Sequence, residues 1–139
     1  MSKIVVIGGG FGGLSFLKKA RKSNNEFTLI DKTNHHLFQP LLYQVATAVL
    51  SPADITVPIR NLFENDNNVK ITLGEVVDIR RDNKQVVLKN EDVIDYDQLI
   101  ISTGASYSYF GNDEWGKFSN GLKNINDALD IRDKILKAF

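Results

Sequence analysis

Six residues near the start of the chain have the spacing of a turn that binds a pyrophosphate. The segment Gly8-Gly9-Gly10-Phe11-Gly12-Gly13 satisfies the pattern G-x-G-x-x-G at Gly8, Gly10 and Gly13. In this pattern the first glycine makes a tight turn, the second lets backbone N–H groups approach the ligand, and the third allows close helix–strand packing. The pyrophosphate would rest on the helix N-terminus, where unpaired N–H groups favour an anion. The motif predicts a dinucleotide site; the alternative is a glycine-rich turn without a ligand.

A carboxylate follows at the distance that such a site needs. Asp31 lies 23 residues after Gly8, where an acidic side chain can accept hydrogen bonds from both hydroxyls of an adenosine ribose. It would repel a 2′-phosphate, which argues against NADP, although the neighbouring Lys32 weakens this argument slightly. The glycines and Asp31 together do not distinguish NAD from FAD.

The elements around these residues form a β-α-β unit. Lys3 to Ile7 is a short apolar run rich in β-branched residues, which predicts a strand buried on both faces. A helix is predicted over 12–22 and a second strand over 27–30. Further strands are predicted over 69–73, 76–79, 85–88, 93–94 and 99–101, and polar turns between the middle three indicate an antiparallel meander. The predicted fold class is α/β, with a Rossmann-like parallel sheet and an antiparallel β-meander.

The connection from His35 to Asn68 is expected to be irregular. Short helices are predicted after Pro40 and at Ser51, where Asp54 completes a capping box. His35 and His36 are the only histidines, but adjacent side chains point in different directions and no third ligand follows at a recognisable spacing. We therefore predict no metal site and interpret this segment as a loop folded against the cofactor side of the domain.

Composition excludes several classes of function. Seventeen basic and seventeen acidic residues give a formal net charge of zero, and no basic cluster offsets this balance, so we expect no nucleic-acid partner. The chain has no cysteine, which excludes a disulfide framework, a thiolate metal site and dithiol redox chemistry within it. The early apolar run is too short for a signal-peptide core or a membrane span.

The segment around Thr103-Gly104 favours FAD. A buried strand that ends in Thr-Gly, and that follows a meander rather than another helix, resembles the second fingerprint of FAD domains in flavoproteins that bind two dinucleotides. The resemblance implies that Thr103 and Gly104 turn the chain away beside the cofactor. It also implies that the segment Gly74-Glu75-Val76-Val77 places a backbone group against the adenine.

Longer stretches point to a narrower family. Residues 4–14, 34–48, 50–55 and 109–115 resemble type II NADH:quinone oxidoreductases, which are single-subunit, rotenone-insensitive NADH dehydrogenases. The most specific run reads His-His-Leu-Phe-Gln-Pro-Leu-Leu-Tyr-Gln. The resemblance implies non-covalent FAD, hydride transfer from NADH to the flavin, and reduction of a membrane quinone without proton pumping. It also implies peripheral attachment to the cytoplasmic face of the membrane.

The same resemblance assigns cofactor contacts to several groups of residues and assigns no catalytic acid or base. The groups are Gly8, Gly10, Phe11, Gly12 and Gly13 at the pyrophosphate; Asp31 and Lys32 at the ribose; Gln39, Pro40, Leu41, Leu42 and Tyr43 near the flavin; Val76 and Val77 at the adenine; and Thr103 and Gly104 closing the site. In such enzymes the flavin carries out the difficult chemistry, and the protein orients it and tunes its electronics.

The end of the chain leads to an expectation about its extent. A helix is predicted from about 124–127, and the chain stops inside this pattern, at Phe139, without a stop signal. We therefore expect an N-terminal FAD-binding part over 1–123 and a terminal helix over 124–139, leading toward an NADH-binding domain and a membrane-docking region beyond. The fragment alone is expected to be inactive, soluble and cytoplasmic, and to self-associate through apolar residues of the terminal helix, Ile135, Leu136 and Phe139. Two alternatives stay open: a dinucleotide-binding or structural fragment without activity, and part of another FAD-dependent NAD(P)H reductase.

Overall fold

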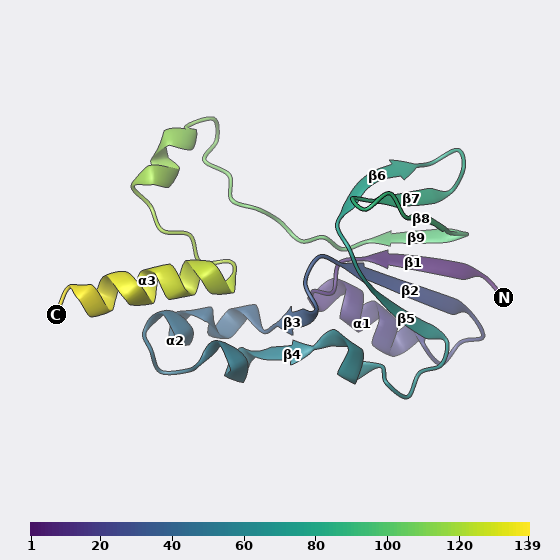
Figure 1. Ribbon diagram of the computed structural model, residues 1–139, viewed down its shortest axis with the longest axis horizontal. Coiled ribbons are helices and arrows are strands. Elements are labelled where there is room, and N and C mark those ends of the chain that lie inside the picture. Colours follow the sequence, from purple (N-terminus) through teal and green to yellow (C-terminus); the bar gives the residue numbers. More distant parts are fainter. The chain divides into compact units, whose positions relative to one another are not determined.

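The computed structural model describes all residues from Met1 to Phe139, which divide into two compact units (Figure 1). The first unit comprises Met1–His36 and Pro58–Gly104, and the second comprises Leu37–Val57 and Ala105–Phe139. The sequence predicted a different division, with an FAD-binding part over 1–123 and a terminal helix over 124–139, and this division stays a prediction.

A four-stranded parallel sheet forms the centre of the first unit. Its strands lie in the order β5 (Val69–Leu73), β2 (Glu26–Asp31), β1 (Lys3–Ile7) and β9 (Gln98–Ile101). All three neighbouring pairs are parallel. The carboxyl ends of the four strands therefore lie at one edge of the sheet, and the segments that follow these strands start from that edge.

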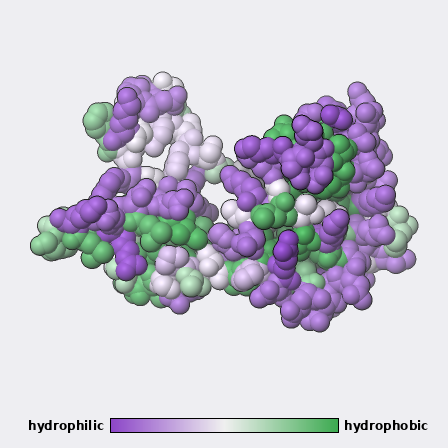
Figure 2. All heavy atoms as spheres, in the orientation of Figure 1, coloured by the Kyte–Doolittle hydropathy of each residue, from purple (hydrophilic) through white to green (hydrophobic).

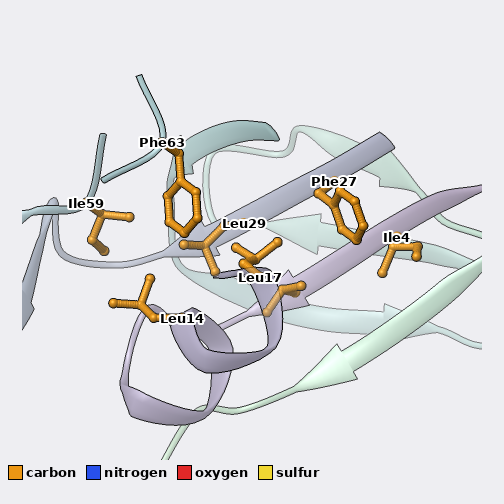
Figure 3. Packing of buried hydrophobic residues seen from close by; sticks show 8 residues of the cluster. Ile4, Leu14, Leu17, Phe27, Leu29, Ile59 and Phe63 are labelled. Carbon is orange, nitrogen blue, oxygen red and sulfur yellow. The ribbon is translucent and has the colours of Figure 1, made fainter. Parts of the chain in front are cut away.

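One face of this sheet is covered by α1 (Phe11–Ala20). Alternate residues of β1 point to this face, because side chains along a strand alternate between its two sides. Ile4 and Val6 pack there against Leu14 and Leu17 of the helix, together with Phe27, Leu29, Ile59 and Phe63 (Figure 3). Leu17 is fully buried, so this layer attaches the helix firmly to the strand that precedes it.

The other face of the sheet is covered by three antiparallel strands, β6 (Val76–Arg80), β7 (Gln85–Leu88) and β8 (Val93–Asp95). The intervening residues of β1 point to this side. Val5 and Ile7 pack with Ile30 of β2 and with Val86 and Leu88 of β7. The predicted α/β class, with a Rossmann-like parallel sheet and an antiparallel meander, is therefore confirmed.

The second unit is built around two helices, α2 (Leu42–Ala46) and α3 (Ile125–Lys137). Short 3₁₀ turns η1 (Gln39–Leu41), η2 (Pro52–Ile55) and η4 (Asp113–Lys117) complete it. Its small core consists of Leu42, Val45, Ala46, Ile55 and Ala128. None of the helices in the structure has the length and apolar character that crossing a membrane requires.

The connection from His35 to Asn68, predicted to be irregular, contains two short strands, so the prediction of an irregular connection is wrong in part. β3 (His35–Leu37) and β4 (Thr56–Pro58) form a two-stranded sheet, and the 3₁₀ turn η3 (Ile59–Leu62) follows. Strands of three residues show too little alternation of polar and apolar side chains to be recognised from sequence. The capping box predicted at Ser51 and Asp54 is confirmed.

Candidate functional site

In the turn between β1 and α1, the protein's own backbone conformation and close contacts require glycine at two positions. Gly8 has a φ of +104°, a conformation that other residues rarely adopt, and a Cβ there would collide with the carbonyl oxygen of Ser102. A Cβ at Gly13 would collide with the carbonyl oxygen of Gly8. These two positions allow the helix to start directly above the end of β1.

Gly10 differs from these two glycines, because nothing inside the protein requires it. Its backbone angles, φ −77° and ψ −168°, are open to any residue. A Cβ at Gly10 would meet no atom within 4 Å. Gly10 is the N-cap residue of α1, and no side chain caps this helix end. The N-terminus of α1 therefore presents backbone to an open space, as a bound anion requires.

Three side chains from distant parts of the sequence hold the backbone of this turn. The Ser102 hydroxyl lies 2.8 Å from the carbonyl oxygen of Ile7 and 3.1 Å from that of Gly8. The N–H of Gly9 donates to Asp31 Oδ2 at 2.5 Å. His36 Nδ1 lies 3.1 Å from the carbonyl oxygen of Gly9. The turn is therefore fixed by residues that follow β9, end β2 and belong to β3.

Asp31, predicted at the ribose, lies at the carboxyl end of β2 beside the glycine turn. Its Oδ1 accepts hydrogen bonds from the backbone N–H and the hydroxyl of Thr33, both at 2.7 Å. Lys32 follows it and is exposed. The backbone carbonyl of Asp31 accepts a hydrogen bond from Gly74 N–H at 2.8 Å, which connects this corner to the segment before β6.

Charged groups flank that segment. The side chain of Glu75 accepts a hydrogen bond from Lys89 Nζ at 2.9 Å. This bond and the charge of Lys89 lower the pKa of the Glu75 carboxyl, with a smaller contribution from Lys32. The next two residues start β6: Val76 is half-buried against the apolar layer, whereas Val77 is 57% exposed.

Thr103 and Gly104 lie at the same edge, directly after β9 and Ser102. Gly104 has a φ of +74°, and a Cβ there would meet no atom within 4 Å. The structure therefore brings together, at one sheet edge of the first unit, the predicted residues from the glycine motif, Asp31, Lys32, Val76, Val77, Thr103 and Gly104.

The predicted residues 39–43 belong to the second unit. Gln39 Nε2 donates to the carbonyl oxygen of Lys123 at 3.3 Å, Pro40 is exposed and Leu41 is half-buried. Leu42 is 1% exposed and belongs to the core of that unit, so its side chain has no free surface for a ligand. Tyr43 is exposed, and its hydroxyl accepts a hydrogen bond from Gln44 at 3.0 Å. A flavin contact by these residues stays a prediction.

Sequence reasoning missed two residues of this corner, Ser102 and His36. No role was predicted for Ser102, although its place between the strand 99–101 and Thr103 could have marked it. His36 was placed in a loop folded against the cofactor side of the domain, without a role of its own in the turn. No group of three or more His, Cys, Asp or Glu residues in the structure could hold a metal ion. The ring of His36 lies edge-on to Phe11, with 5.0 Å between centroids.

Comparison with known proteins decides the family. The sequence profile of the pyridine nucleotide-disulphide oxidoreductases matches residues 2–138. The chain belongs to this family. It is 48% identical over 140 residues to the type II NADH:quinone oxidoreductase NdhA of Mycobacterium tuberculosis, and the match covers 99% of this chain and 30% of that protein. The resemblance to type II NADH:quinone oxidoreductases is therefore confirmed.

Solved structures agree with this assignment. NDH2 of Plasmodium falciparum, determined in complex with NADH, has a TM-score of 0.84 and 31% identity over 98% of this chain and 29% of its own. The sulfide:quinone oxidoreductase of Aquifex aeolicus has a TM-score of 0.89 and 25% identity over 99% of this chain and 32% of its own. The chain thus spans about a third of the length of the proteins it matches.

Proposed function

We propose that this chain binds FAD at the carboxyl edge of its parallel sheet. We also propose that the longer protein passes a hydride from NADH to this FAD and two electrons on to a membrane quinone. The observation that supports FAD binding most directly is Gly10, a glycine that no internal contact or backbone strain requires. Its lack of a side chain serves a ligand that approaches the backbone, as a dinucleotide pyrophosphate does.

The residues of this edge can meet each part of the cofactor. The N-terminus of α1 carries no acidic residue in its first turn, so its unpaired N–H groups and its dipole favour the pyrophosphate. Thr103 and Gly104 would close the site beside the cofactor, and the backbone at Val76 and Val77 would face the adenine.

Asp31 can serve the ribose while it holds the turn. A carboxylate offers about four lone-pair positions, and three are used by Gly9 and Thr33. One position on Oδ2 stays available for a ribose hydroxyl. The Thr33 hydroxyl also lies 3.2 Å from the carbonyl oxygen of His35. If that hydroxyl turns to this second acceptor, it releases a further position on Oδ1 for the second ribose hydroxyl.

FAD, when bound, supplies the hydride acceptor and the two-electron carrier. The chain's own part is to bind and orient the cofactor, and we propose no side chain as a catalytic acid or base. Gln39, Pro40, Leu41 and Tyr43, with the backbone of Leu42, would approach the flavin. The chain has no cysteine, so a redox dithiol cannot come from these residues. We propose that the longer protein works at the cytoplasmic face of the membrane as a peripheral enzyme and that this chain alone does not oxidise NADH.

The test is a titration of the purified chain with FAD, followed by visible absorption and by quenching of flavin fluorescence. Gly10→Ala places a methyl group where the pyrophosphate would approach, and we expect it to weaken FAD binding at least tenfold. Ser15→Ala, on the exposed face of α1, is the matched control and should bind as the unaltered chain does. Failure of the unaltered chain to bind FAD, or equal binding by Gly10→Ala, would contradict the proposed cofactor site.

The electron acceptor is tested separately on the longer protein. NADH oxidation should depend on an added quinone, and the isolated chain with FAD, NADH and quinone should show no turnover. Turnover with another acceptor and none with a quinone would assign the longer protein to a different FAD-dependent reductase.

A further inference from the structure

We propose that His36 is a positioning residue that aims the N–H of Gly10 at the cofactor pyrophosphate. This inference rests on the proposed FAD site. His36 itself does not need to touch the ligand. It acts by fixing one peptide group of the glycine turn, the group that joins Gly9 to Gly10.

The geometry determines which way that peptide faces. His36 Nδ1 lies 3.1 Å from the Gly9 carbonyl oxygen. Because a carbonyl oxygen only accepts, Nδ1 must carry the proton. A trans peptide is planar, so its C=O and its N–H point in opposite directions. The Gly9 carbonyl faces the imidazole, and the N–H of Gly10 therefore points away from it.

The N–H of Gly10 has nothing else to bind. It donates to no acceptor within the chain, and a Cβ on this residue would meet no atom within 4 Å. An unpaired donor at a helix N-terminus, on a residue whose Cβ position is open, is suited to an anionic oxygen.

His36 provides the only side-chain hold on this peptide. The preceding peptide is held at both ends, because the Gly8 carbonyl lies 3.1 Å from the Ser102 hydroxyl and the Gly9 N–H donates to Asp31. The Gly9–Gly10 peptide lies between two glycines, whose backbones rotate at little steric cost. Without the imidazole this peptide can flip and turn its carbonyl oxygen, rather than its N–H, toward the ligand.

The imidazole is itself held in place. Its ring meets that of Phe11, the first residue of α1, at an interplanar angle of 90° and a centroid distance of 5.0 Å. This edge-to-face geometry is favourable for aromatic pairs. Phe11 was predicted from the family resemblance to contact the cofactor. Its contact with His36 gives it a second role, which is to support the residue that orients the turn.

The experiment compares three variants of the full chain. His36→Leu removes the donor, whereas the amide nitrogen of His36→Asn can take the place of Nδ1 and donate to the same carbonyl. His35→Leu changes the neighbouring histidine, whose ring makes no hydrogen bond in the structure. FAD affinity is measured by fluorescence quenching. The Gly10 amide and the imidazole nitrogens are followed by ¹⁵N NMR without cofactor, and circular dichroism checks that each variant is folded.

We expect His36→Leu to weaken FAD binding by about 3–10-fold, the effect of losing one hydrogen bond. His36→Asn should recover affinity to within about twofold, a recovery that general damage to the fold would not allow. Without cofactor, His36 should be protonated at Nδ1, and the Gly10 amide signal should move in His36→Leu and return in His36→Asn.

The outcomes separate the two proposals. If the unaltered chain binds no FAD, the proposed function is overturned, and the inference about His36 is overturned with it. If the unaltered chain binds FAD and a folded His36→Leu binds equally well, only the inference is overturned. An unprotonated Nδ1, or a folded His36→Asn that behaves like His36→Leu, would overturn it as well.

Discussion

Two glycines of the same motif should respond to alanine with very different changes in stability. Gly13→Ala pushes a methyl group against the carbonyl oxygen of Gly8 and toward the Ser102 hydroxyl that lies 3.1 Å from that oxygen. Gly10→Ala places the same methyl group in open space, on a backbone that alanine adopts without strain. The first variant should therefore lower the free energy of unfolding, and the second should leave it nearly unchanged.

The magnitudes follow from these contacts. For Gly13→Ala, overpacking costs about 1–3 kcal/mol and displacing the Gly8 carbonyl from Ser102 costs about 1 kcal/mol more. The better helix propensity of alanine stabilises the folded state by about 1 kcal/mol, so the free energy of unfolding falls by about 1–3 kcal/mol in all. For Gly10→Ala, the smaller freedom of the unfolded chain stabilises by about 0.4–1 kcal/mol, but Gly10 is the N-cap of α1, where alanine is less favourable than glycine by about 0.5–1 kcal/mol, so the net change is close to zero.

Thermal unfolding followed by circular dichroism measures this difference. For 139 residues the unfolding entropy corresponds to about 3 °C per kcal/mol. The midpoint of Gly13→Ala should thus lie roughly 3–9 °C below that of Gly10→Ala, which should unfold close to the unaltered chain. If Gly10→Ala unfolds at as low a temperature as Gly13→Ala does, Gly10 has a structural role, and the argument that it is reserved for a ligand is refuted.

Three further predictions follow from contacts described by the structure. Asp31→Ala should weaken FAD binding and also lower the urea midpoint without cofactor, because the N–H of Gly9 loses its acceptor; an unchanged midpoint would contradict this. Partial burial, together with the hydrogen bond to Asp127 and the charge of that carboxylate, raises the pKa of Tyr107 to about 12. The folded chain therefore holds this proton more tightly than the unfolded chain, and stability present below pH 10 should fall as pH rises through 12. An absorbance titration at 295 nm should show one late ionisation that Tyr107→Phe removes. Exposed apolar residues on α3, among them Leu136 at 58% exposure, give this helix an apolar surface (Figure 2), so the sedimentation coefficient should rise with concentration; Leu136→Glu should suppress the rise, and a concentration-independent monomer would contradict it.

The parallel sheet could be predicted from sequence because its strands carry a strong local signal. The apolar run Lys3–Ile7 matches β1 at both ends, and 69–73 matches β5; in the antiparallel meander, 85–88 matches β7. Strands buried on both faces have no polar alternation, so their type and limits are unusually clear. The start of the terminal helix was predicted near 124–127, and in the structure Asn124 and Asp127 form a capping box at this point.

The contacts that hold the glycine turn could not be predicted in the same way. Ser102 is 94 residues from Gly8 and His36 is 27 residues from Gly9, and no periodic pattern connects residues so far apart. The role of each depends on which strands become neighbours and on which carbonyl groups the turn leaves unpaired. The sequence contains the glycine motif, but only the three-dimensional arrangement shows what keeps its peptides in place.

The strand order also has a consequence for how the protein is made. β1 pairs with β9 on one side, and Ser102, which closes the turn, follows Ile7 by 95 residues. Protein synthesis adds about 5–20 residues per second, so β9 and Ser102 are made roughly 5–20 s after β1. During that interval one edge of β1 has no partner and the glycine turn lacks its Ser102 contacts. The nascent chain therefore completes the edge that carries the glycine turn only when β9 has left the ribosome. A chain interrupted before Gln98 would leave β1 open to pairing with a strand from another molecule.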